Sequence, residues 1–132
     1  MKMLHFQIDP HSGLPVYRQL MDQTKYYIAS GVLKAGDLLP SIRELSAALA
    51  VNPTTVVKAY GELEHEGVIQ MRHGKGAFVA EGSKGASSAE ARRALQRLAR
   101  QLAVEAAQMG ASREDVQRLV AEEMEQMKGK DL

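Results

Sequence analysis

The chain has 132 residues, of which 45% are hydrophobic, so it can form one small domain with an additional segment. It contains no cysteine, which excludes disulfide bonds and thiolate metal sites. Seventeen basic and sixteen acidic side chains give a formal charge of +1, so net charge alone does not indicate a nucleic-acid partner. The sequence lacks apolar stretches of transmembrane length and a signal-peptide pattern. We therefore expect a soluble, cytoplasmic protein that is not bound to a membrane.

The first thirty residues predict an extended segment followed by a helix. Residues 3–8 (MLHFQI) indicate a short strand or an extended arm. After Pro15, apolar residues recur at three- and four-residue steps until Gly31. Proline in the first turn and glycine just after the last are typical helix boundaries, so we expect a helix over about residues 15–30.

Two further helices follow, joined by a very short connection. Ser41 and Glu44 have the spacing of a capping box, which predicts a helix that ends near Ala50. Asn52 is a favourable N-cap and Pro53 a favourable first helical residue, so the next helix begins almost immediately. Two helices joined in this way cross at a steep angle, and this is the helix-turn-helix arrangement.

A β-hairpin is predicted after the helix-turn-helix. Residues 68–80 read VIQMRHGKGAFVA, in which two apolar segments flank the glycine-rich turn at 73–76. A helix-turn-helix followed by a hairpin is a winged helix. The predicted fold class is therefore mainly α (α+β).

The last fifty residues differ in composition from the winged helix. The segment EGSKGASS at 81–88 is rich in glycine and serine, so we expect a winged helix-turn-helix domain over 1–80, a linker over 81–88 and a helical hairpin over 89–132. Ser112 provides the capping signal of the second helix. Apolar residues at helical spacing form one stripe on the hairpin, and they include Leu95, Leu98, Leu102, Met109, Val116, Val120 and Met124.

This apolar stripe predicts a partner. Two amphipathic helices cannot cover both stripes against each other, and a symmetric homodimer is the most common solution. The alternative is that the tail packs against the winged helix of its own chain.

The helix that begins at Pro53 has an unusual order of charges. Thr54, Thr55 and Lys58 share the outer face of its first two turns. In a helix-turn-helix, this end of the second helix faces base edges in the major groove, where hydroxyl and ammonium groups are favourable and carboxylates are not. The acids of the helix come towards its other end, at Glu62, Glu64 and Glu66.

Other polar groups are candidates for contacts with the DNA backbone. Ser41, at the start of its helix, and Arg43, in the first turn, could hold a phosphate. In the hairpin, basic residues lie beside glycines that permit close approach, and the candidates are Arg72, His73, Gly74, Lys75 and Gly76. Each feature alone also fits an ordinary helix cap or an ordinary solvated turn, so the hypothesis rests on their joint placement.

These residues resemble a known family. The stretch LPSIRELSAALAVNPTTVVKAYGELEHEGVIQMRHGKGAFVA resembles the DNA-binding domain of GntR-type bacterial transcription regulators. The motifs that carry the resemblance are P-S-x-R-x-L, N-P-x-T-V-x-K-A-Y and the G-x-G of the hairpin. The whole chain resembles the YtrA-like subfamily, whose members have a short two-helix tail. Most of the wider family has arginine in place of Pro53, and a glycine often stands in place of Ala50.

Other functional classes have little support in the sequence. There is no Ser-His-Asp set, no plausible pair of catalytic carboxylates and no phosphate-binding glycine motif after a strand, so we expect neither an enzyme nor a cofactor. The four histidines lack the spacing of paired metal ligands, and methionines at helical spacing are typical of a core. We therefore expect no metal site, and the sequence identifies no small-molecule effector.

The sequence thus predicts a homodimeric, sequence-specific transcription regulator. We expect a repressor that binds a palindromic double-stranded DNA operator. The alternative is a winged-helix protein-interaction module without specific DNA binding, because the fold alone does not decide between the two.

Overall fold

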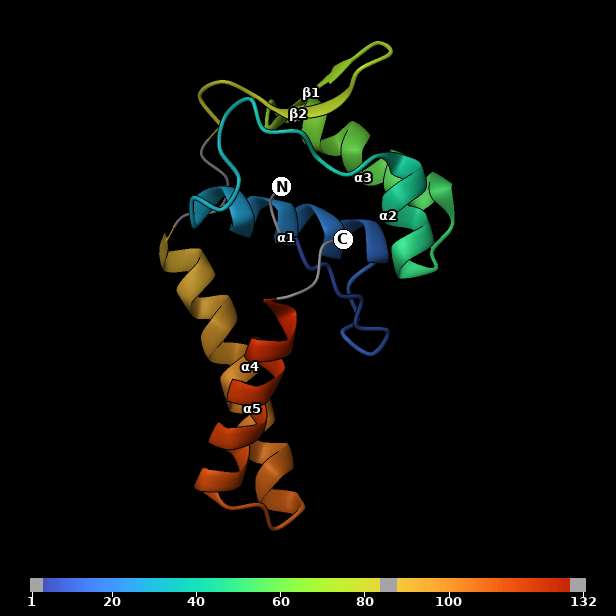
Figure 1. The fold of residues 1–132 in the computed structure, drawn as a ribbon. Coiled ribbons are helices and arrows are strands. Elements are labelled where there is room, and N and C mark those ends of the chain that lie inside the picture. Colours follow the sequence, from blue (N-terminus) through green and yellow to red (C-terminus); the bar gives the residue numbers. More distant parts are fainter. Residues whose placement is uncertain (1–3, 84–87, 129–132) are drawn as a thin grey trace.

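The computed structural model describes residues 4–83 and 88–128, which form a winged helix and a two-helix tail (Figure 1). The elements in chain order are α1 (Val16–Ala29), α2 (Ile42–Leu49), α3 (Pro53–His65), β1 (Ile69–Arg72), β2 (Gly76–Val79), α4 (Ser88–Gln108) and α5 (Arg113–Met127). This order confirms the predicted fold class. Part of the expected linker, residues 84–87, lies outside the described residues.

The predicted capping signals are present at the starts of the helices. The Glu44 amide donates to Ser41 Oγ at 3.0 Å, and the Ser41 amide donates to Glu44 Oε1 at 3.1 Å, which completes the capping box of α2. Asn52 Oδ1 accepts from the Thr54 amide at 2.9 Å at the start of α3. Local side-chain chemistry therefore accounts for where α2 and α3 begin.

The turn between α2 and α3 depends on Ala50. Its φ of 54° lies in the left-handed region, which disfavours a residue with a Cβ atom by about 1–2 kcal/mol. Glycine adopts this conformation without that penalty, which explains the preference for glycine in related sequences. The left-handed residue reverses the chain, so that α3 begins at Pro53.

The hairpin has a third segment along one edge. β1 and β2 pair antiparallel, and Leu38 forms an isolated bridge with Phe78 of β2. The Leu39 amide donates to the Ala77 carbonyl oxygen at 2.8 Å. The segment before α2 therefore covers backbone groups that would otherwise form an open strand edge.

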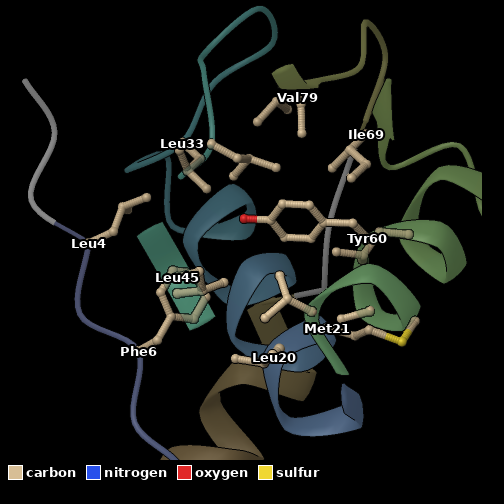
Figure 2. Packing of buried hydrophobic residues seen from close by; sticks show 14 residues of the cluster. Leu4, Phe6, Leu20, Met21, Leu33, Leu45, Tyr60, Ile69 and Val79 are labelled. Atoms are coloured by element: carbon tan, nitrogen blue, oxygen red, sulfur yellow. The ribbon is translucent and has the colours of Figure 1, made fainter. Parts of the chain in front are cut away.

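The core lies between α1, α2, α3 and the base of the hairpin (Figure 2). Leu20 of α1, Leu45 of α2 and Val56 and Leu63 of α3 are at most 1% exposed. The helical spacing on α3 places Val56, Tyr60 and Leu63 on one side, as predicted from the sequence. Packing of that side against α1 determines which side of α3 faces outward.

The N-terminal segment is an arm and not a strand. Residues 4–9 belong to no helix or strand, so the structure supports the arm and not the strand interpretation for these residues. Leu4 and Phe6 are buried, and the Phe6 ring meets the Tyr27 ring edge-to-face at 5.7 Å. The arm is thus part of the core although it lacks a neighbouring strand.

Side chains of α1 replace the missing strand as hydrogen-bond partners of the arm. Three of them both donate to and accept from its backbone, at distances of 2.6–3.0 Å: Tyr27 with His5, Gln23 with Gln7, and Gln19 with Asp9. Buried backbone groups need such partners.

The tail is a helical hairpin that extends away from the winged helix (Figure 1). The Asp115 amide donates to Ser112 Oγ at 3.1 Å, as the capping signal of α5 predicts. α4 contacts α1, yet Leu95 and Leu98 are 67% and 63% exposed and Met109 is 80% exposed. The winged helix of the same chain therefore does not cover the apolar stripe.

Tyr60 makes a buried polar contact between α3 and the segment before α2. Its side chain is 2% exposed, and its hydroxyl donates to the Pro40 carbonyl oxygen at 2.6 Å. Burial, and then the nearby Glu44 carboxylate, raise the pKa of Tyr60 above its usual range. The hydroxyl therefore keeps its proton and remains a donor.

We expect Tyr60→Phe to lower the free energy of unfolding by about 1 kcal/mol, because the Pro40 carbonyl would lose its buried partner. Urea denaturation followed by circular dichroism measures this change. Tyr26→Phe, on the partly exposed side of α1, is the matched control and should have little effect. Equal stability of the Tyr60→Phe variant and the unmodified protein would contradict the role given to this hydrogen bond.

Candidate nucleic-acid interface

The outer side of α3 carries the residues expected to face DNA. Thr54 and Lys58 are exposed and Thr55 is partly exposed, while Val56 and Tyr60 on the other side are buried. The Thr54 hydroxyl donates to Asn52 Oδ1 at 2.8 Å, so its proton is engaged in the helix cap and its lone pairs remain as acceptors.

Lys58 has a neighbour that the sequence did not reveal. Its ammonium nitrogen lies 4.3 Å from the centre of the Tyr17 ring, which comes from the start of α1. This is a cation–π contact, and it orients a long side chain that would otherwise sample many rotamers. Tyr17 is therefore a candidate positioning residue. The spacing of α1 predicts only that Tyr17 is in a helix, because its contact with Lys58 depends on how α1 and α3 pack.

The capping box limits what Ser41 can offer to a phosphate. Its amide donates to the Glu44 carboxylate, and its hydroxyl oxygen accepts from the Glu44 amide. The Ser41 amide, and then its hydroxyl, hold the pKa of the exposed Glu44 carboxyl below its usual range, so this carboxylate is charged at neutral pH. The charge stabilises the helix start but disfavours a second anion there. Arg43 is exposed beside it and is the stronger candidate of the two predicted residues.

The hairpin has the exposed basic tip that the sequence predicted. The Arg72 guanidinium lies 4.5 Å from the centre of the Phe78 ring across the hairpin, and His73 and Lys75 are exposed in the turn. Phe78 is thus a second aromatic partner of a candidate cation, and cross-strand pairing is the signal that could have identified it.

The two glycines of the hairpin turn, Gly74 and Gly76, are required by the backbone conformation and packing of the hairpin. Gly74 has a φ of +74° and Gly76 a φ of +113°, which disfavour other residues. A Cβ atom on Gly76 would also lie 3.2 Å from Leu38 Cδ1. These two glycines are explained by the fold without any ligand.

Two of the three acids near the end of α3, Glu64 and Glu66, have partners within the protein. Glu64 Oε2 accepts from the Met71 amide of β1 at 3.0 Å. Glu66 forms an ion pair of 2.6 Å with Lys25 of α1. These carboxylates connect α3 to the hairpin and to α1, so their placement has a structural reason that the charge pattern alone did not reveal.

The elements that carry the candidate residues lie on one side of the winged helix (Figure 1). In Figure 1 the tip of the hairpin extends on the same side as α2 and the beginning of α3.

Along the described ranges, no helix has the length and apolar character needed to span a membrane. Within those same ranges, no three potential metal-binding side chains come together.

Comparisons with known proteins identify the family. The model of "Bacterial regulatory proteins, gntR family" matches residues 16–79, which cover α1 to β2. The repressor YtrA of Bacillus subtilis is 47% identical over 78 residues, which are 59% of this chain and 60% of that protein. The solved structure of YtrA from Sulfolobus acidocaldarius, a GntR-family transcription factor, is 38% identical with a TM-score of 0.56, and the match covers 76% of this chain and 97% of that one. This chain belongs to the gntR family.

The matches also support the finer resemblance. Two of them are YtrA proteins, which confirms the YtrA-like subfamily. The DNA-binding domain of AraR, whose structure contains operator DNA, is 30% identical with a TM-score of 0.53 over 59% of this chain and 98% of that one. The curated relative is named as a transcriptional repressor and not as an enzyme. The chain aligns with about three fifths of the Bacillus subtilis YtrA repressor.

We expect a measurable coupling between Tyr17 and Lys58. A double-mutant cycle with Tyr17→Leu and Lys58→Met should give about 0.5–1 kcal/mol of coupling in the free energy of unfolding, as for other exposed cation–π pairs. The same cycle with Tyr17→Phe, which keeps the ring, is the control. NMR provides a second measurement, because ring currents should shift the Lys58 side-chain protons upfield in the unmodified protein and not in Tyr17→Leu. The contact would be contradicted if the two mutations had additive effects on the free energy of unfolding and the Lys58 side-chain protons showed no upfield shift.

Proposed function

We propose that this protein is a sequence-specific DNA-binding transcription regulator that represses its target by binding a palindromic operator as a homodimer. The observation that carries the proposal is the outer side of α3, where hydroxyl groups and an oriented lysine occupy the first two turns, while Glu64 and Glu66 bind the hairpin and α1. Membership of the gntR family supports DNA binding, and the name of the Bacillus subtilis YtrA repressor supports repression.

In this proposal α3 enters the major groove with its N-terminal end foremost. Thr54, Thr55 and Lys58 meet base edges, and Arg43 binds a nearby phosphate. The hairpin, with Arg72, His73, Gly74, Lys75 and Gly76 at its tip, lies along a flanking minor groove. The acids that bind β1 and α1 remain away from the duplex.

The tail supports the homodimer. Both of its helices carry exposed apolar side chains, and a second copy can cover them in a symmetric interface. The residues that we assign to this interface are Leu95, Leu98, Leu102, Met109, Val116, Val120 and Met124. Joining two winged helices makes the second DNA contact effectively intramolecular, which raises affinity for a two-half-site operator. The division into a DNA-binding domain over 1–80 and a dimerisation hairpin over 89–132 follows from this arrangement.

The first experiment tests the DNA-binding side. We expect Lys58→Ala and Arg43→Ala each to weaken binding to a selected operator duplex by roughly 1–3 kcal/mol, because each removes a contact to a base or phosphate. Arg118→Ala in α5 removes a surface arginine far along the chain and should leave affinity unchanged. Fluorescence anisotropy at moderate salt measures all three, and unchanged affinity in both α2 and α3 variants would refute the assigned interface.

The second experiment tests the dimer. Leu98→Asp would place a carboxylate without a partner in the apolar stripe, which is unfavourable by several kcal/mol in a buried interface. We expect a monomer by light scattering that retains its folded winged helix and loses specific operator binding. Arg100→Asp, two residues further along α4 and away from the stripe, is the matched control. A Leu98→Asp protein that remains dimeric would show that the tail is not the interface.

A further inference from the structure

The outer side of α3 contains two residues that the recognition of DNA by Thr54 and Lys58 does not use. Val57 is 51% exposed, although it is apolar, and Gly61 is exposed in the interior of the helix. Residues three and four apart share one side of an α-helix, so both lie in line with Thr54 and Lys58. These four residues form a continuous stripe, here called the outer stripe, opposite the buried side of α3.

Gly61 has no internal reason to be glycine. A Cβ atom at this position would meet no atom within 4 Å in the part of the chain that the structure describes, so close packing there does not require its absence. Its φ is not positive, unlike that of eight other glycines. A glycine in a helix interior makes the helix less stable than an alanine does, by about 1 kcal/mol. In α3 this glycine lies on the side that faces outward. A backbone that must be approached closely from outside is the remaining structural reason.

Val57 is an equally unexpected choice for an exposed helical position. Its branched side chain lowers helix propensity and gains nothing from solvent. Its neighbours on the outer stripe are Thr54, Lys58 and Gly61, so the exposed apolar area is too small for an ordinary protein interface. In the major groove, however, the C5 methyl group of thymine is an apolar feature that a small side chain can contact.

We propose, on the basis of the DNA-binding function above, that Val57 and Gly61 complete the reading surface of α3. Val57 contacts a thymine methyl group in each half-site. Gly61, one turn further along, lets the duplex approach the helix backbone closely enough for that contact to form. The two residues therefore add to the sequence preference set by Thr54, Thr55 and Lys58, while Arg43 and the basic tip of the hairpin supply attraction to the phosphates.

The contribution of Val57 can be isolated by removing one methyl group from the DNA. The probe is the tightest-binding duplex that the full-length protein selects from a random pool. Each thymine in a half-site is then replaced by uracil, which removes only the C5 methyl. The unmodified protein should lose about fourfold in affinity at one thymine, the effect expected for one buried methyl group. Val57→Ala should bind both duplexes equally, whereas Val57→Ile should still distinguish them.

The contribution of Gly61 is tested by adding bulk at a position where the free protein has room for it. Gly61→Ala should raise the midpoint of thermal unfolding, because alanine is the better helix former and meets no neighbour. The same variant should bind the selected duplex more weakly, and Gly61→Leu should lose about tenfold, as an overpacked contact does. Circular dichroism confirms that both variants are folded.

The outcomes separate this inference from the function on which it rests. Discrimination between the selected duplex and a scrambled one tests the proposed function, and its absence would overturn both proposals. The role of Val57 alone would be overturned if the protein preferred the selected duplex but lost no affinity on replacement of thymine by uracil. A selected half-site that contains no thymine would overturn it as well. Equal affinity of Gly61→Leu and the unmodified protein would overturn the role of Gly61.

Discussion

The orientation of α3 depends on its buried side, which packs against α1 and is hydrogen-bonded to the segment before α2. The Tyr60 hydroxyl donates to the Pro40 carbonyl oxygen, and Val56 and Leu63 pack beside it in the core. Burial raises the pKa of this hydroxyl, so it remains a donor at neutral pH. Because these contacts together set the rotation of α3 about its own axis, they also determine which residues face outward. The position of the candidate recognition residues is thus a consequence of core packing.

The distribution of charged side chains along α3 follows from the same packing of this helix against its neighbours. The carboxylates of Glu64 and Glu66 are directed to β1 and α1, where they stabilise the contacts of α3 with its neighbours. The first turns of the helix are left with hydroxyl groups and Lys58, whose position over the Tyr17 ring limits its motion. A chain with a formal charge of +1 can therefore present a local surface that favours phosphate, because its two signs of charge are separated along one helix.

Much of this architecture could be predicted because its signals are local. Ser41, Asn52 and Ser112 specify helix starts through hydrogen bonds within three residues, and these predictions were confirmed. Contacts between elements could not be predicted in this way. The pairing of Lys58 with Tyr17 depends on the packing of α1 against α3, since the two residues are far apart in sequence. The occupation of the Ser41 amide by Glu44 was implicit in the capping box, but its effect on phosphate binding required the observed geometry.

The N-terminal arm shows how an extended segment can be held in register by a helix. Its hydrogen bonds fall at every second residue of the arm and every fourth residue of α1, with the two running in opposite directions. Two extended residues advance about 6.6 Å and four helical residues about 6.0 Å, so the two repeats are nearly commensurate. A shift of one residue would break all three pairs together and turn Leu4 and Phe6 out of the core. The register of the arm along α1 is therefore fixed by three side chains of the helix, Gln19, Gln23 and Tyr27.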